Sequence, residues 1–270
     1  MPLVIAALCS VLAAGVYVAA VHVPAVQAAD LHTLEGFIGL WRLPGAGHVH
    51  WLVDLFDPLP FAVLVIGVLA AATLMRRPRI GLLAAGAMIA ANVTSQVLKV
   101  LLATQRDFPP GHYLGPEAWP SGHSTAVMSF ALALVLIAPP HRRRLAAALG
   151  GVLTVTTVYG ILIMGWHYPS DVVGGLLVAT AWASLAAVPL RAREPVSPSA
   201  PVLAGCVLVV AASLAVISRP FAAAAYAEAN TTFVFGALAI AVAALVLSGS
   251  VLAPTGARPR PPARSPRARG

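Results

Sequence analysis

Lys99 and Arg106 form a pair of cations at the end of a long apolar run. They are seven residues apart, which returns both side chains to nearly the same face of a helix with 3.6 residues per turn. Asn92 and Gln96 continue this face inward. Such a face suits an anion site at a membrane boundary. A single lysine at this position also fits a simpler interpretation, in which its long side chain only reaches from the apolar region to water.

The run Pro120-Ser121-Gly122-His123 precedes another apolar stretch and has the residue types of a helix start. Serine caps free N–H groups, proline suits the first turn, and glycine allows a ligand close to the backbone. Free N–H groups at a helix start bind phosphate with the help of the helix dipole. We therefore expect a phosphate cradle here, with His123 placed to give a proton to an oxygen that leaves phosphorus.

His167 and Asp171 stand where two further apolar runs meet. A carboxylate four residues from a histidine can accept a hydrogen bond from one ring nitrogen and direct the other outward. An imidazole held in this way is a competent nucleophile or base. The spacing alone also fits an ordinary helix cap. Chemistry is favoured because three segment ends carry Lys/Arg, His and His/Asp together.

The segments that position these residues are apolar. Hydrophobic residues make up 59% of the 270 and charged residues only 10%, whereas soluble domains carry about 25% charged residues. This excludes an ordinary soluble globule. The net charge of +8 comes from scattered basic residues with few aromatics among them, which argues against nucleic-acid binding. Cys9 and Cys206 lie inside apolar runs and provide neither a disulfide framework nor a zinc site.

Eight runs approach the roughly 20 residues that a helix needs to cross a bilayer. The sequence therefore predicts an all-α fold, a polytopic membrane helix bundle of about eight transmembrane helices. The first run also resembles a secretory signal, but it is long and lacks a basic start, so we expect a retained helix. The runs cover residues 3–28, 58–75, 80–103, 121–139, 145–165, 171–190, 201–218 and 232–253.

Basic residues predict the orientation, because cytoplasmic loops retain Lys and Arg. If every run crosses the membrane, the arginines at 76–79, 142–144 and 191–193 and those of the tail all fall on one side. Glu194 is the one acidic residue that joins them. We therefore expect a multi-pass protein of the cell (plasma or inner) membrane with both termini in the cytoplasm. The residues described above then face outward.

The chain divides into four parts on this basis. Residues 1–57 form the first transmembrane helix and an external loop, whose part 29–57 we expect to lie on the outer leaflet. Residues 58–193 form a helical core, and residues 194–253 add two helices that pack against the core or against a second copy, which makes a homo-oligomer possible. Residues 254–270 form a Pro- and Arg-rich cytoplasmic tail that is expected to be disordered.

In their order, Lys99-x6-Arg106, Pro120-Ser121-Gly122-His123 and His167-x3-Asp171 resemble the three-part signature of the type 2 phosphatidic acid phosphatase superfamily. These are membrane-bound lipid phosphate phosphatases. The resemblance covers about residues 58–190. It implies a six-helix core with the active site at the outer face, and hydrolysis through a phosphohistidine without a metal or other cofactor.

The resemblance also implies a role for each residue. His167 attacks phosphorus, Asp171 orients it, and His123 protonates the leaving group. The phosphoryl oxygens are held by Lys99, Arg106, Ser121 and Gly122. The implied substrate is a lipid phosphate or diphosphate, such as a polyprenyl diphosphate, a polyprenyl-phosphate sugar phosphate, phosphatidic acid or phosphatidylglycerol phosphate.

Two positions depart from the family pattern. Arg106 is followed by Asp107 where the family has proline, and Gly160-Ile161 stands where the family has Ser-Arg. One phosphate-binding guanidinium is therefore absent, and we hypothesise that it is replaced from the external loop by Arg42, His48 or His50. Two alternatives stay open: a catalytically silent scaffold or carrier that binds a lipid phosphate, and a phosphotransferase that uses the same histidine.

Overall fold

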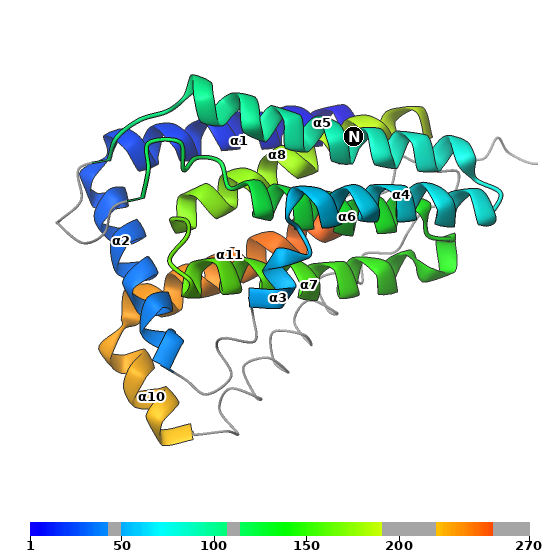
Figure 1. Ribbon diagram of the computed structural model, residues 1–270. Helices are drawn as coiled ribbons and strands as arrows, with labels where there is room; N and C mark the ends of the chain where they lie inside the picture. Colours follow the sequence, from blue (N-terminus) through cyan, green and yellow to red (C-terminus); the bar gives the residue numbers. More distant parts are fainter. Residues whose placement is uncertain (43–49, 107–113, 191–219, 251–270) are drawn as a thin grey trace, which may run out of the picture.

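The computed structural model describes residues 1–42, 50–106, 114–190 and 220–250. Every regular element in these ranges is a helix (Figure 1). The α-helices are α1 (Pro2–His22), α2 (Pro24–Gly39), α3 (His50–Asp54), α4 (Pro58–Leu74), α5 (Pro78–Leu101), α6 (Gly122–Ile137), α7 (Arg143–Ile163), α8 (Pro169–Ala187), α10 (Pro220–Ala229) and α11 (Thr231–Ser250). The short 3-10 turns are η1 (Leu40–Arg42), η3 (Pro140–Arg142) and η4 (Val188–Leu190).

Five helices in the described residues are long and apolar enough to cross a membrane: α1, α5, α7 extended by η3, α8 extended by η4, and α11. Helices α4 and α6 are apolar but shorter. These seven helices correspond to seven of the eight predicted runs, while the run 201–218 lies outside the described residues. The prediction of an all-α membrane bundle is confirmed.

Helices α6 and α8 form the centre of the bundle. Helix α8 packs against α1, α5 and α6, and α7 fills the space between α6 and α11 (Figure 1). Met128 and Leu132 of α6 and Leu176 of α8 are among the largest fully buried side chains. The outer helices expose large apolar side chains such as Val63 and Leu74. An apolar exterior of this kind is what a bundle surrounded by lipid requires.

The first predicted span is divided in the structure. Helix α1 ends at His22 because Pro24 restricts the residue before it, and Val23 is extended with φ −108° and ψ 106°. Helix α2 then packs across the ends of α7 and α11, with Leu34 and Phe37 buried (Figure 1). The location of residues 29–57 on the membrane surface stays a prediction, and the part of them that lies in α2 packs against the bundle.

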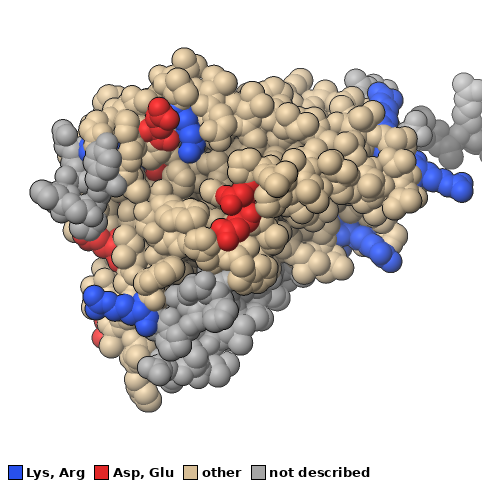
Figure 2. Space-filling view, in the orientation of Figure 1, with Lys and Arg blue, Asp and Glu red and all other residues tan. Residues whose placement is uncertain are grey.

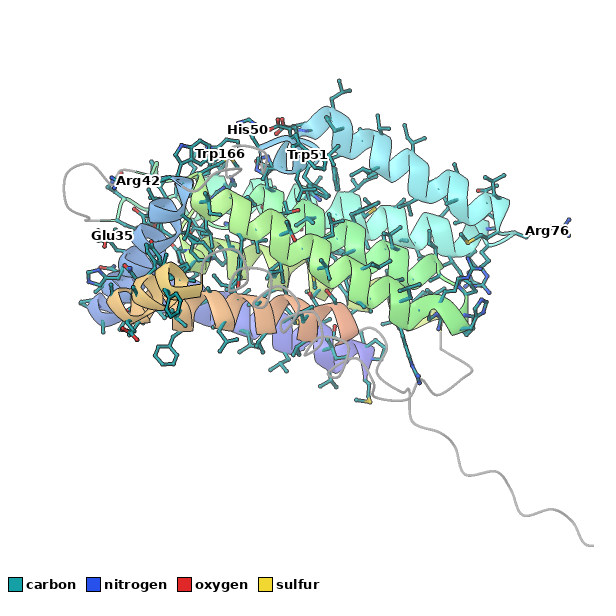
Figure 3. All side chains as sticks on the ribbon, turned by 90° about the horizontal axis from the view of Figure 1, so that it is seen from below. Glu35, Arg42, His50, Trp51, Arg76 and Trp166 are labelled. Carbon is teal, nitrogen blue, oxygen red and sulfur yellow. The ribbon has the colours of Figure 1, made fainter. Side chains whose placement is uncertain are left out.

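The two ends of the bundle differ in charge. Arg77, between α4 and α5, and Arg143, at the start of α7, both donate to the carbonyl oxygen of Ala138, at 3.3 Å and 3.2 Å. Two of the predicted arginine clusters therefore meet at one end, where Figure 2 shows basic side chains projecting to the right, while residues 191–193 and the tail lie outside the described residues. Figure 3 shows Arg76 at this end and Trp166 far from it. The starts of α6 and α8 lie at the opposite end.

Candidate active site

His167 lies in the turn that joins α7 to α8, and Asp171 lies in the first turn of α8. The Tyr168 N–H donates to Asp171 Oδ2 at 3.0 Å, which fixes the carboxylate against the helix start. The Nδ1 of His167 is 3.5 Å from the same oxygen. This separation is longer than an ordinary hydrogen bond, so the contact is an electrostatic one. Nε2 is the ring nitrogen opposite the carboxylate.

The environment of His167 keeps its imidazole neutral. Burial lowers the pKa of His167, the carboxylate of Asp171 opposes this effect, and the charges of Lys99 and His123 add to the lowering. A neutral imidazole has the free lone pair that a nucleophile needs. The same interactions show that residues from two distant segments, the end of α5 and the start of α6, converge on His167 and Asp171.

Arg106 is held by two carboxylates. Its Nη2 donates to Asp171 Oδ1 at 2.5 Å, and its Nη1 donates to Asp30 Oδ2 at 3.3 Å and to Ser170 Oγ at 3.2 Å. The guanidinium carbon lies 4.8 Å from the centre of the Tyr168 ring. Only 7% of the side chain is exposed. The arginine that we expect to hold phosphate is therefore occupied by acidic partners in this structure.

Lys99 lies in the last turn of α5, half-buried, and interacts electrostatically with Asp171 and Glu117. Gln96, one turn earlier, reaches toward the start of α6. A Cβ atom added to Gly122 would lie 3.3 Å from the Gln96 side-chain nitrogen. Lys99 and Gln96 therefore turn toward the starts of α8 and α6. The prediction that Arg106 lies on the same helix face is wrong, because α5 ends at Leu101 and Arg106 lies in the segment that follows.

Ser121 is the N-cap of α6, where its Oγ accepts from the Ser124 N–H at 3.3 Å. Its own N–H donates to the carbonyl oxygen of Asp171 at 2.9 Å, which ties the start of α6 to that of α8. Gly175 allows this approach, because a Cβ there would lie 2.6 Å from the Ser121 carbonyl oxygen. The Ser121 hydroxyl is thus used to cap the helix, and the adjacent backbone is fixed beside Asp171.

His123 has a carboxylate partner that the sequence analysis missed. Its Nε2 lies 3.0 Å from Oδ1 of Asp57, the N-cap residue of α4. The Trp166 ring lies on another side of the imidazole, with 5.7 Å between the ring centres. The site therefore contains two histidine–aspartate pairs, one at the start of α8 and one between α4 and α6.

The position of the missing family arginine lies in the core. Ile161 is fully buried among apolar side chains that include Phe37. Of the three hypothesised replacements, Arg42 is exposed and His48 lies outside the described residues, as does Asp107. His50 pairs with Asp54 at 2.9 Å, and its ring centre is 5.5 Å from that of Trp166 (Figure 3). His50 thus lies next to Trp166.

Asp30 is the second residue that the sequence analysis missed. Its Oδ1 accepts the Ser170 N–H at 2.8 Å, and its Oδ2 accepts the Ser170 hydroxyl at 2.5 Å. Burial, followed by the charge of Asp171, raises the pKa of Asp30 to about 6, while the hydrogen bonds from Ser170 and the charge of Arg106 oppose this shift. Helix α2 thereby contributes a buried carboxylate to the site.

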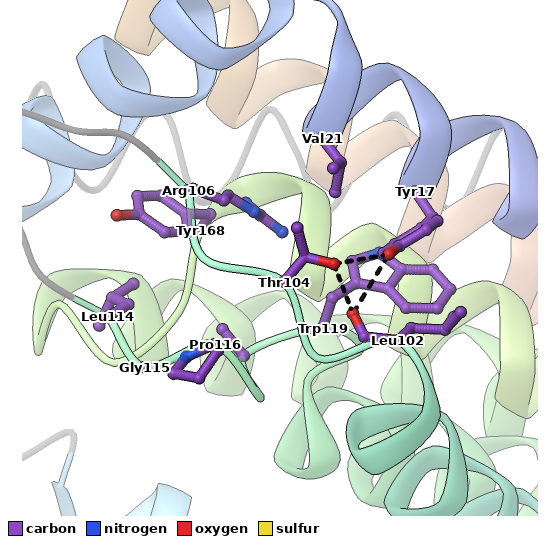
Figure 4. A pocket seen from close by; sticks show the side chains of 11 residues that line it. Tyr17, Val21, Leu102, Thr104, Arg106, Leu114, Gly115, Pro116, Trp119 and Tyr168 are labelled. Atoms are coloured by element: carbon purple, nitrogen blue, oxygen red, sulfur yellow. Dashed lines mark hydrogen bonds between the residues drawn. The ribbon is translucent and has the colours of Figure 1, made fainter.

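A small pocket opens beside Arg106, between α1 and the segment that connects α5 to α6 (Figure 4). The Tyr17 hydroxyl closes one side of it by donating to the Leu102 carbonyl oxygen at 3.2 Å and lying 2.9 Å from Thr104 Oγ1. Tyr168 and Trp119 also line the pocket. Helix α1 is therefore part of the wall around the site.

Residues 80–195 match the model of the PAP2 superfamily. The resemblance predicted from the sequence is confirmed over these residues. They include all the residues to which that resemblance assigns a role. The matched segment brings Lys99, His123 and Asp171 within electrostatic range of His167. Ser121 and Gly122 lie at the adjoining start of α6.

Two known proteins are similar to the chain. An undecaprenyl-diphosphatase of Sulfolobus acidocaldarius is 30% identical over 128 residues, which is 45% of this chain and 60% of that protein. The match thus spans less than two thirds of that relative. The crystal structure of a transmembrane PAP2-type phosphatidylglycerolphosphate phosphatase from Bacillus subtilis matches with a TM-score of 0.52 and 23% identity, over 68% of this chain and 93% of that one. This likeness supports the fold.

Proposed function

We propose that this PAP2 protein is an integral membrane phosphatase that hydrolyses a lipid phosphate or diphosphate through a phosphohistidine on His167. The observation that carries the proposal is the placement of His167 beside Asp171, within electrostatic range of His123 and Lys99. These are a nucleophile, its orienting acid, a proton donor and an anion-binding cation. The names of the two similar proteins agree with this reaction class.

In the first step, the neutral His167 attacks phosphorus through Nε2 while Asp171 balances the charge that develops on the ring. The new N–P bond forms as the P–O bond to the leaving group breaks. His123 gives a proton to the departing alkoxide or phosphate. Lys99 and Arg106 stabilise the charge on the phosphoryl oxygens, which is worth most in a site that is shielded from water.

In the second step, water releases inorganic phosphate from His167. His123, now neutral, takes a proton from the attacking water, and the N–P bond breaks as the new P–O bond forms. Both histidines return to their initial protonation states. The carboxylate of Asp57 lies on Nε2 of His123, so it balances the imidazolium before the first step and after the second.

The site is proposed to face the extracytoplasmic side. Support comes from the arginines that meet at the opposite end of the bundle, because such residues are retained in cytoplasmic loops. The substrate head group then reaches the site from the outer leaflet while its tail stays among lipids. Polyprenyl carriers and phospholipids both fit this arrangement, and the acceptor is proposed to be water rather than a second hydroxyl.

The proposal is tested by phosphate release from purified protein in EDTA, with a panel of polyprenyl and phospholipid phosphates and diphosphates. We expect release by the native chain and its loss in His167→Ala, by a factor of at least about 10³ because the nucleophile is removed. His123→Ala is expected to lose nearly as much. His141→Ala serves as a matched control, because His141 lies in η3 at the other end of the bundle.

Two results would contradict the proposal. Phosphate release that persists in His167→Ala would exclude a phosphohistidine on His167 as the intermediate. Absence of release across the panel, from folded protein that still binds the lipids, would favour a silent scaffold or carrier. Transfer of phosphate to an added alcohol, with the same dependence on His167, would identify a phosphotransferase instead.

A further inference from the structure

Asp30 is the most buried acidic residue that the structure describes outside the PAP2 segment (residues 80–195). It comes from α2, which precedes that segment, and 6% of it is exposed. Both of its oxygens are used, one by the Ser170 N–H and the other by the Ser170 hydroxyl and Arg106. The site at the start of α8 is therefore completed by a helix that carries none of the PAP2 motifs.

The groups around Arg106 leave no net positive charge before any substrate arrives. Arg106 and Lys99 bring two positive charges, ionised Asp30 and Asp171 bring two negative ones, and Glu117 also interacts with Lys99. A phosphate monoester adds about 1.5 to 2 further negative charges at neutral pH. In a buried site, where charge is costly unless it is paired, binding is favoured if one carboxylate becomes neutral.

Asp30 is better placed than Asp171 to become neutral. Asp171 accepts the Tyr168 N–H and the shorter Arg106 bond, and it also faces His167. Asp30 makes the longer contact of the two with Arg106, at 3.3 Å. Burial and the neighbouring Asp171 charge already raise the pKa of Asp30 to about 6.

The charged and titratable groups that face Asp30 come from few elements. Helix α8 provides Asp171, the segment after α5 provides Arg106, and the turn before α8 provides Tyr168. Helix α11 carries no charged residue, and the two arginines of α7 lie at its far end. Helix α1 ends in His22, for which no contact with Asp30 occurs among the described side chains.

From this geometry, which extends the proposed phosphate site, we infer that Asp30 is a positioning residue for Arg106 and takes up a proton when the substrate phosphate binds. The ionised carboxylate holds the guanidinium in place while the site is empty. Once protonated, Asp30 retains a hydrogen bond to Ser170 but no longer competes for the Arg106 charge. The Nη1 group of Arg106 is then free to donate to a phosphoryl oxygen.

The test uses sulfate, a phosphate-like dianion whose own charge is constant from about pH 5 to about pH 8, so that a change in affinity reports protonation of the protein. Sulfate binding to the purified full-length chain is measured by calorimetry in two buffers of different ionisation enthalpy. Above about pH 6 we expect affinity to fall by up to about tenfold per pH unit. Proton uptake accompanies binding in this range.

In the Asp30→Asn variant, we expect sulfate affinity to lose the part of its pH dependence that comes from Asp30. We also expect fewer protons to be taken up when sulfate binds. Asp54→Asn is the matched control, because Asp54 is exposed and pairs with His50 rather than with Arg106. A pH dependence and proton uptake equal to those of the native chain in Asp30→Asn would overturn the inference. A loss of sulfate affinity in Asp30→Asn that is the same at every pH would also overturn the inference. It would indicate that Asp30 only holds Arg106 in place and does not take up a proton.

A second measurement on the native chain does not depend on the variant folding. Infrared difference spectra on sulfate addition are expected to show the carbonyl stretch of a newly protonated carboxylic acid, which histidine cannot produce. Absence of this band would overturn the inference. The phosphate-release assay with lipids tests the proposed function separately. Protonation of Asp30 on sulfate binding without phosphate release would support the inference but not the proposed function. Phosphate release without protonation of Asp30 would support only the proposed function.

Discussion

Asp57 and His123 lie 66 residues apart in the sequence, yet Asp57 Oδ1 and His123 Nε2 are 3.0 Å apart. Asp57 stands at the N-cap position of α4, where its side chain makes no cap hydrogen bond, and His123 lies in the first turn of α6. The contact fixes the orientation of the imidazole, so the ring presents its other nitrogen, Nδ1, away from the carboxylate. His123 and His167 are thus each oriented by an aspartate from a helix start.

Asp57→Asn is expected to lower kcat by about tenfold and to change KM little, because it weakens the orientation of the proton donor without removing a phosphate-binding cation. Asparagine caps a helix as well as aspartate does, so α4 is preserved. The measurement is initial rate against substrate concentration over a range of pH. Asp54→Asn is the control, and a raised KM with unchanged kcat would show that Asp57 acts on binding instead.

Ile161→Arg restores the family residue, but the structure predicts destabilisation rather than tighter phosphate binding. Ile161 is fully buried in the apolar core, where an unpaired guanidinium costs about 3 kcal/mol or more. Ile161→Leu conserves volume and is expected to cost less than about 1.5 kcal/mol. Thermal unfolding compares the two. Native stability together with tighter sulfate binding in Ile161→Arg would show that this position opens into the site.

The stability of the chain is expected to depend on pH through Asp30. Its pKa is raised from 3.8 to about 6 on folding, so between these values the folded chain keeps a proton that the unfolded chain has released. The contribution of this group to stability therefore falls as pH rises through that window. The unfolding temperature of the native chain minus that of Asp30→Asn is expected to decrease from about pH 4 to about pH 6. An increase would mean that the Ser170 hydrogen bonds and the Arg106 charge outweigh the burial of Asp30 and keep it ionised.

The proposed orientation is tested by labelling single cysteines from outside the cell. Arg42→Cys lies at the α2 end of the bundle and Arg79→Cys at the arginine-rich end, and both side chains are exposed. In a background with Cys9 and Cys206 replaced by serine, a membrane-impermeant thiol reagent is expected to label position 42 and not position 79. Labelling of both from the same side would contradict the crossing scheme.

Much of the site could be predicted because its signals are local. His167 and Asp171 are one helical turn apart, and the residues before α6 are typical of a helix start. Lys99 and Arg106 fall near the end of one apolar run. These patterns need only the spacing of residues along one segment, and the helix bounds follow from apolar run length and proline.

Asp30 and Asp57 were missed because their partners are 140 and 66 residues away. A usable signal existed for each. Asp30 lies at a spacing of four and seven from Leu34 and Phe37, so it is a carboxylate on the apolar face of a helix. Asp57 directly precedes Pro58 and an apolar run, which is a typical N-cap position.

Asp30 also constrains how the chain assembles. During synthesis it emerges 76 residues before Arg106 and 140 residues before Ser170. A buried carboxylate needs these partners, so α2 cannot settle into its final place until α8 has entered the membrane. Helix α2, which is synthesised early, therefore completes its packing only after α8 has been inserted. The site therefore forms only after α8 has been inserted, and a nascent or truncated chain without α8 lacks it.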